Sequence, residues 1–94
     1  MLIIAGHLVV EPTDRDRYLE LNASVVVDAR RAVGCLDFVQ AADPVDPARI
    51  NIYERWDTEA HLLAFRGAGQ PSEGGPAITG ADVRRYVISS VEEP

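Results

Sequence analysis

The 94-residue chain predicts an α+β domain whose strands and helices follow the order β-α-β-β-α-β. Two observations carry this prediction. Four short aliphatic or β-branched runs are bounded by turn residues, and two segments with helix-start signals separate the first run from the second and the third from the fourth. This order is the split βαβ arrangement called ferredoxin-like, with an antiparallel sheet. At this length we expect one domain, residues 1–94.

The first predicted strand covers residues 2–10, and both of its alternating faces are mostly apolar, which favours a strand covered on both sides. A helix is expected to begin after Pro12, with Thr13 as N-cap and Asp16 in the capping-box position. Apolar residues then recur at three- and four-residue steps. Gly34 is expected to end this helix, because glycine is common just past a helix C-terminus.

The second and third predicted strands cover residues 35–40 and 49–56. The segment between them is short and rich in Asp and Pro, which favours a hairpin. Asp57 and Thr58 offer a cap for a second helix, expected over residues 60–66.

Residues 67–80 hold five of the seven glycines and two prolines, which is typical of a loop. Either a lid over a binding site or an ordinary surface loop fits this composition. One helical turn is expected near residues 76–79, and the last strand is expected over residues 83–91.

Two helices can cover only one face of the predicted sheet. The four predicted strands have apolar residues on both faces, so the other face must meet something else, and a second copy of the same sheet is the simplest candidate. A homodimer that packs through its sheet faces is therefore expected. The small size of the chain points the same way, because small domains bury a low fraction of their surface alone.

Charge and composition lower the expectation of several functions. The 15 acidic residues outnumber the 9 basic ones, and a net charge of −6 disfavours binding to nucleic acid or to anionic membranes. All nine basic residues are arginine, which excludes lysine chemistry, and the single cysteine, Cys35, cannot form a metal cluster of thiolates. With no signal peptide or membrane span apparent, we expect a cytoplasmic protein.

Three stretches resemble a known family. Residues 54–61, ERWDTEAH, resemble the Glu-x-Trp-(Glu/Asp)-(Ser/Thr) signature of the antibiotic biosynthesis monooxygenase (ABM) family, which belongs to the dimeric α+β barrel superfamily. Residues 5–12, AGHLVVEP, and residues 34–38, GCLDF, are similar to that family's first strand and its helix-to-strand turn. The resemblance covers essentially the whole chain in the expected order.

The resemblance implies two ferredoxin-like sheets packed as a dimeric α+β barrel, with a pocket between the sheet and the helices of each subunit. It also implies oxidation of an aromatic polyketide-like phenol, anthrone or quinol by O₂ without metal, flavin or haem. In such chemistry an electron-rich phenolate passes one electron to O₂, and the protein binds, deprotonates and excludes water. No cofactor and no metal site are therefore expected, with O₂ as co-substrate.

The chain departs from the family at several positions. The anthrone-oxidising members have an Asn four residues before the Trp, where this chain has Ile52, and Asn51 lies on the opposite strand face. Their helix tyrosine falls at Leu62. Haem-degrading relatives have an Asn where this chain has Gly6, and a haem-binding His where it has only residues 69–71, GQP. Haem degradation is therefore not expected.

The candidate site residues fall into two groups. The candidates for base or polar catalytic contact are His7, His61 and Asn51, since an imidazole titrates near neutrality. Trp56 is expected to line the pocket because family members use that position so. The other candidate substrate contacts are Phe38, Ile52, Tyr53, Leu62 and Tyr86.

Each candidate also has a structural interpretation. Trp56 is equally well explained as core, His7 as a buried structural histidine and His61 as a solvent-facing residue. The acids Asp37 and Glu54 lie among apolar neighbours, so each is an edge or rim residue, is salt-linked to an arginine such as Arg55 or Arg85, or is a substrate-deprotonating carboxylate. These alternatives stay open at the level of sequence.

The favoured function is a cofactor-independent monooxygenase acting on a small aromatic phenol, anthrone or quinol. One alternative is a non-catalytic dimeric barrel that binds a small hydrophobic ligand. Another is an isomerase or cyclase on the same scaffold, since fold does not fix reaction.

Overall fold

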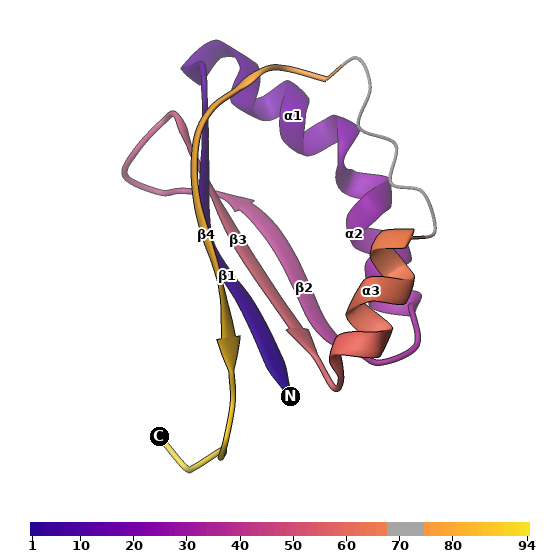
Figure 1. The fold of residues 1–94 in the computed structure, drawn as a ribbon. Helices are drawn as coiled ribbons and strands as arrows, with labels where there is room; N and C mark the ends of the chain where they lie inside the picture. The colour runs from indigo at the N-terminus through magenta and orange to yellow at the C-terminus, as the bar shows by residue number, and fades with distance from the viewer. Residues whose placement is uncertain (68–74) are drawn as a thin grey trace.

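A computed structural model describes residues 1–67 and 75–94 of the chain. Four strands form one antiparallel sheet in the order β2-β3-β1-β4, and the helices lie on one face of it (Figure 1). The elements are β1 (Leu2–Val10), the 3₁₀ turn η1 (Pro12–Asp14), α1 (Arg15–Leu21), α2 (Ala23–Arg31), β2 (Cys35–Ala42), β3 (Arg49–Trp56), α3 (Glu59–Gly67) and β4 (Ile78–Val87). The ferredoxin-like prediction is confirmed.

The first helical segment is broken, and the prediction of one continuous helix was wrong. Helices α1 and α2 meet at Asn22, whose side-chain Nδ2 donates to the Tyr18 carbonyl at 2.9 Å. Asparagine is unfavourable inside a helix because its side chain competes for backbone hydrogen bonds in this way. The predicted capping box is also wrong: Thr13 lies inside η1, and no side chain caps η1 or α1.

Strand β4 begins earlier and ends earlier than expected. It starts at Ile78, so the helical turn predicted near residues 76–79 is wrong, and it ends at Val87 rather than residue 91. The reason is tertiary: β1 is nine residues long and pairs with β4 as far as the Val10–Ile78 partners. The predicted lid falls partly on residues 68–74, which lie outside the described residues.

The helix-facing side of the sheet carries the apolar core, which is divided into two clusters. We call the first the Trp56 cluster; its buried members are Leu2, Ile4, Ala29, Phe38, Trp56 and Leu62. We call the second the Ile50 cluster; its buried members are Val10, Ile50 and Ile52. Both clusters lie between strand positions of one parity and the helices, as the period-two alternation of strands requires.

The other side of the sheet, which we call the open face, is covered by no helix (Figure 1). On β1 it carries Ile3, Ala5, His7 and Val9, as the sequence predicts, and on β3 it carries Arg49, Asn51, Tyr53 and Arg55. The expectation of a doubly apolar sheet is therefore wrong for the sheet as a whole. Apolar side chains on β1 meet polar and aromatic ones on β3.

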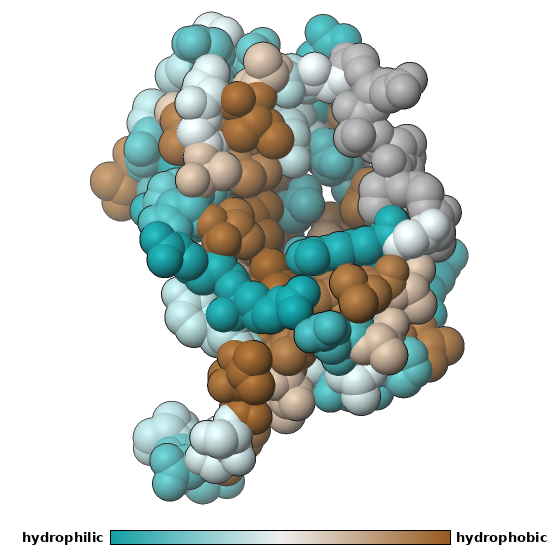
Figure 2. Space-filling model, viewed as in Figure 1, coloured by the Kyte–Doolittle hydropathy of each residue, from teal (hydrophilic) through white to brown (hydrophobic). Residues whose placement is uncertain are grey.

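Strand β4 lies at the edge of the sheet and is exposed along nearly its whole length. Tyr86 is 50% exposed and Val87 77%, and Figure 2 shows apolar side chains on the surface along this strand. Among the described helices, none has the length and apolar character that crossing a membrane requires.

Asp43 organises the connection between β2 and β3. Its Oδ2 accepts hydrogen bonds from the backbone N–H groups of Val45, at 3.0 Å, and Asp46, at 2.8 Å, while its Oδ1 accepts one from Asn51 Nδ2 at 2.9 Å. These hydrogen bonds, with the Asn51 one foremost, lower the pKa of the Asp43 carboxyl to about 2. The ionised carboxylate therefore holds the hairpin turn together.

Replacing Asp43 with Asn should destabilise the protein in a pH-dependent way. Because the folded-state pKa is depressed, the carboxylate contributes stability above its unfolded value of 3.8, and this contribution is lost as the pH falls toward about 2. Urea unfolding should show wild type and Asp43→Asn differing at pH 6 and converging near pH 2. Asp28→Asn, an exposed position on α2, serves as control. A difference that stays constant with pH would contradict this role.

Candidate functional site

The register of the strands divides the sequence-predicted site residues between the two faces of the sheet. Phe38, Ile52 and Trp56 lie on the helix-facing side, where Leu62 of α3 joins the Trp56 cluster. The open face holds the polar and hydroxyl-bearing candidates His7, Asn51, Tyr53 and Tyr86. His61 lies at a third place, at the beginning of α3. One compact site cannot use all of these residues.

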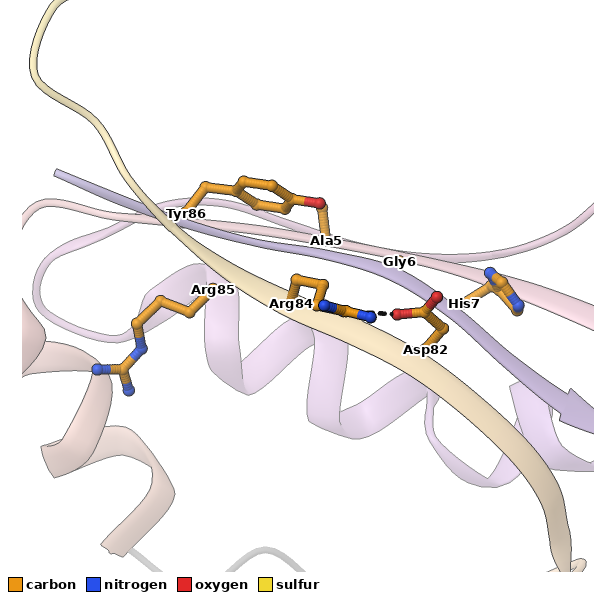
Figure 3. A pocket seen from close by; sticks show the side chains of 7 residues that line it. All are labelled: Ala5, Gly6, His7, Asp82, Arg84, Arg85 and Tyr86. Carbon is orange, nitrogen blue, oxygen red and sulfur yellow. Dashed lines mark hydrogen bonds and ion pairs between the residues drawn. The ribbon is translucent and has the colours of Figure 1, made fainter.

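On the open face, His7 and Tyr86 line a shallow cavity of about 470 Å³ between β1 and β4. In Figure 3 the Tyr86 ring lies over Ala5, and Arg84 of β4 reaches Asp82, whose Oδ1 accepts from Arg84 Nε at 2.9 Å. This ion pair is largely exposed, so it adds little stability.

The close approach of β1 and β4 under this cavity depends on Gly6. Its φ is 152°, and a Cβ atom there would collide with the Asp82 backbone carbonyl. Glycine tolerates both the conformation and the contact. The position therefore holds no side chain on either face of the sheet.

The candidate Asn51 is held by hydrogen bonds at both ends of its amide. Its Oδ1 accepts from Arg49 Nε at 2.7 Å, and its Nδ2 donates to Asp43 as described above. It is the register partner of His7 on the same face. These bonds give Asn51 a clear structural role beside the predicted catalytic one.

On the helix-facing side, Trp56 is fully buried and bonded to a neighbouring acid. Its indole Nε1 donates to Glu54 Oε1 at 3.0 Å. Burial raises the pKa of the Glu54 carboxyl above its usual value, although this hydrogen bond and the positive charge of Arg66 lower it part of the way. The carboxylate is thus held in a partly desolvated position.

An aromatic group surrounds this pair. The Phe65 ring of α3 lies 5.4 Å from the Trp56 ring and 6.0 Å from the Phe38 ring, centroid to centroid. The Phe38 and Phe65 rings meet edge to face, the arrangement that their quadrupoles favour. The Trp56 cluster is therefore a closely packed aromatic wall.

Between the two core clusters, one level of the helix-facing side carries no side chain on β1 and a polar side chain on β2. Gly6 and Gln40 flank Ile52 there, and Glu54 lies one position farther along β3. Gln40 Oε1 is buried and has no hydrogen-bond partner within residues 1–67 and 75–94. We call this level the mid-sheet gap. Figure 2 shows the surface hollowed between the side chains of β4 and the helices.

His61 forms a tight pair with Asp57. Its Nδ1 lies 2.7 Å from Asp57 Oδ1, and its backbone N–H donates to Thr58 Oγ1 at 3.2 Å. The hydrogen bond from His61 is the main cause that lowers the pKa of the Asp57 carboxyl. The pair packs directly against Gly34, whose φ is +85° and whose carbonyl accepts from the Asp57 N–H at 2.9 Å.

His61 also lines a small cavity of about 240 Å³, whose other lining residues are Ala32, Val33, Ala64 and Phe65. This cavity lies between the segment that follows α2 and helix α3. The sequence identified His61, but it did not identify Asp57 as its partner. The four-residue spacing on a helix start was the available signal.

The expected salt links of Asp37 and Glu54 do not form within the described part of the chain. Arg85 pairs with Glu59 at 2.9 Å, and Asp37 Oδ1 instead accepts from the backbone N–H of Phe38 at 2.9 Å. Glu54 takes part in no ion pair among the described residues; its partner is the Trp56 indole. The salt-link interpretation of Asp37 and Glu54 was therefore wrong.

Other groups with possible chemistry are fewer. Cys35 is half-buried, and burial, followed by the charge of Glu54, raises the pKa of its thiol, which makes it a weak nucleophile. Within the described ranges, no three His, Cys, Asp or Glu side chains come together as a metal-binding group.

Comparison with known proteins gives a family and a set of structural neighbours. The family model described as antibiotic biosynthesis monooxygenase matches residues 1–71. A provisionally assigned antibiotic biosynthesis monooxygenase from Deinococcus radiodurans superposes with a TM-score of 0.83 at 18% identity, covering 100% of this chain and 98% of that one. Among curated proteins, no sequence matches the chain.

Two further structures are similar. A provisionally assigned antibiotic biosynthesis monooxygenase from Nitrosomonas europaea has a TM-score of 0.79 at 15% identity, covering 96% of this chain and 100% of that one. The haem degrader MhuD of Mycobacterium tuberculosis, solved with two haems bound in its active site, has a TM-score of 0.72 at 13% identity, covering 99% and 100%. At these identities the likeness shows a shared fold.

Replacing Gly34 with Ala should both destabilise the protein and separate the His61–Asp57 pair. A Cβ at this position would collide with both side chains, and a positive φ costs a non-glycine residue about 1–3 kcal/mol. Thermal unfolding should show the loss of stability, and the NMR signals of the His61 imidazole should change their chemical shifts. Gly67→Ala, where a Cβ meets nothing, is the control. Equal stability of the two variants would contradict this packing.

Proposed function

Because the chain belongs to the antibiotic biosynthesis monooxygenase family, we propose that it is a cofactor-independent monooxygenase for an aromatic phenol, anthrone or quinol. The observation that best supports this proposal is the mid-sheet gap. It lies beside the aromatic wall of Trp56 and contains a buried acceptor, Gln40 Oε1, that lacks a donor. A hydroxylated aromatic ring supplies both an apolar face and an O–H donor.

The proposed substrate therefore binds between the sheet and the helices. Gly6 contributes no side chain to this side of the sheet, and the rings of Phe38 and Trp56 lie on the same side. A buried acceptor without a donor costs about 1–3 kcal/mol, so a ligand hydroxyl that satisfies Gln40 gains affinity there.

The proposed reaction balances without a further redox partner. In an anthrone the reacting carbon is a CH₂ group, and loss of one proton gives an electron-rich oxyanion. The oxyanion passes one electron to O₂, and the resulting carbon radical and superoxide combine as a peroxide. Return of the proton and loss of water, which carries one oxygen atom and both hydrogens, leave a carbonyl that contains the other oxygen atom. The protein binds, deprotonates and excludes bulk water.

A haem does not fit the described residues on this side of the sheet. A haem iron needs an axial ligand such as histidine. Here His7 lies on the open face, and Nδ1 of His61 is bonded to Asp57 at the beginning of α3. We therefore propose that this chain does not share the haem chemistry of its structural neighbour.

A non-catalytic, ligand-binding role is the second candidate. Ile52 and Leu62 stand where the anthrone-oxidising members have a polar Asn and Tyr, and both side chains belong to the apolar core. A pocket with few polar groups can bind an apolar ligand without having the groups that catalysis needs.

We also propose that two copies pack through their open faces. Apolar Ile3, Ala5 and Val39 lie there without a covering layer, and the face carries charges of both signs. A second open face would cover the apolar positions, as in other two-layer sheet assemblies. The proposed homodimer has no helix in its interface.

Oxygen uptake tests the proposed reaction. Metal-free protein should consume O₂ above the uncatalysed rate with at least one member of a panel of anthrones and hydroquinones. Trp56→Phe should lower kcat/KM about tenfold or more, equivalent to about 1.4 kcal/mol, if it stays folded by circular dichroism. His7→Ala is the open-face comparison. If O₂ consumption stays at the uncatalysed rate with every compound of the panel, the non-catalytic binding role is favoured. If only His7→Ala loses activity, the active site lies on the open face instead.

Sedimentation tests the proposed assembly. At micromolar concentration the wild type should sediment at twice the chain mass of 10.3 kDa. Val39→Asp should give a monomer, because it places a charge on the open face. Val45→Asp, at a position that is 89% exposed on the β2–β3 turn, should remain dimeric. A monomeric wild type would rule out this interface.

A further inference from the structure

Glu54 occupies an unusual place for an acid. It lies on the central region of the helix-facing side, where its register partners are Ile4 and Phe38, which are only 4% and 3% exposed. Charged groups are rarely buried unless they are paired. Yet Glu54 makes no ion pair among residues 1–67 and 75–94, and its one hydrogen bond comes from a neutral donor, the Trp56 indole.

This arrangement costs stability rather than adding to it. A half-buried carboxylate without a cation loses part of its hydration, and one neutral hydrogen bond offsets only some of that loss. An apolar residue of similar size would fill the same position among Ile4 and Phe38 more favourably. A group kept in an unfavourable setting beside a binding region is a functional candidate.

The charged and titratable groups around Glu54 leave its carboxylate available. Arg66 of α3 is the cation whose charge acts on it, at longer range than an ion pair, and Cys35 of β2 is the neighbouring thiol. Arg85 of β4 is bonded to Glu59. From α2, Arg30 Nε donates to the Phe38 carbonyl at 2.8 Å.

The indole bond fixes one carboxylate oxygen and leaves the other for a ligand. Oε1 accepts from Trp56 Nε1, whereas Oε2 receives no hydrogen bond among the described residues. Glu54 is also the next residue of β3 on the helix-facing side after Ile52, so it lies diagonally next to Gln40 and Gly6 of the mid-sheet gap. A ring that stacks beside Trp56 in the gap thus lies within reach of this carboxylate.

We propose that Glu54 is the general base that removes the proton from the substrate, with Trp56 as the positioning residue that orients its carboxylate. The inference rests on the proposed function. In the step, the C–H or O–H bond of the substrate breaks, its electron pair stays on the substrate as an oxyanion, and the proton passes to Glu54. The same proton returns when the peroxide loses water. Burial strengthens this base by destabilising its charged form.

Three kinetic measurements test the role of Glu54. Glu54→Gln keeps an acceptor for the indole but removes the base, so kcat should fall about 10²-fold or more. The acid limb of the wild-type pH profile, with an apparent pKa above 4.5, should disappear. Formate should partly restore the activity of Glu54→Ala, which a purely structural residue would not allow. Glu59→Gln, at an exposed acid of α3, should keep wild-type rates.

Stability separates this role from a structural one. Because the folded-state pKa of Glu54 is raised, the protein loses stability as the pH rises through that pKa, and Glu54→Gln removes the loss. The variant should therefore be at least as stable as wild type at pH 7. A Glu54→Gln protein within threefold of wild-type kcat, with the same acid limb, would overturn the proposal.

An oxygen-free measurement keeps this test independent of the proposed oxidation. Under nitrogen in D₂O, wild-type protein should accelerate exchange of the CH₂ hydrogens of anthrone for deuterium, followed by NMR, and Glu54→Gln should not. Exchange without O₂ uptake in air would reject the monooxygenase but keep Glu54 as base. Oxygen uptake with equal exchange in wild type and Glu54→Gln would reject Glu54 as the base but keep the monooxygenase. If wild-type protein does not accelerate exchange at all, the role of Glu54 as base is also rejected.

Discussion

The alternation of side chains along one four-stranded sheet is the constraint on which the rest of this structure depends. Because the period is two and the helices cover a single face, each strand position is committed either to the helices or to the open face. Trp56 and Glu54 share the covered face, and His7 and Asn51 share the other. No change of rotamer can bring these two pairs together, since a sheet lies between them.

The covered face combines stability and chemistry in a small volume. The rings of Phe38, Phe65 and Trp56 pack together, and the half-buried Glu54 carboxylate is hydrogen-bonded to the Trp56 indole. The free energy gained by packing these rings therefore offsets the unfavourable placement of the Glu54 carboxylate. In the proposed reaction the same packing excludes water from the oxyanion. Stability and reactivity then depend on the same residues, as in other sites where strain is retained for function.

Local patterns in the sequence predicted the strands and their order well, because alternation and turn composition are local signals. They did not predict the helix break, where the Asn22 side chain bonds to a backbone carbonyl, or the early start of β4, which follows from pairing with a long β1. Of the candidate site, family resemblance identified Trp56. The sequence could not predict that Glu54 has no ion-pair partner among the described residues, because this depends on where Arg85 and Arg66 lie in three dimensions.

The central position of β1 has a consequence for how the chain folds. Strands β2 and β3 are neighbours in the sequence, whereas β1 pairs with the more distant β3 and β4. The Thr79 hydroxyl, for example, donates a hydrogen bond to the carbonyl of Val9, which lies 70 residues earlier. Non-local pairing requires closing a long loop before contacts compensate for the lost chain entropy, and it slows folding. Until β4 arrives, one edge of β1 and the apolar side chains beside it are unprotected. Pairing with β4 thus protects this edge of β1 from strand pairing with other chains.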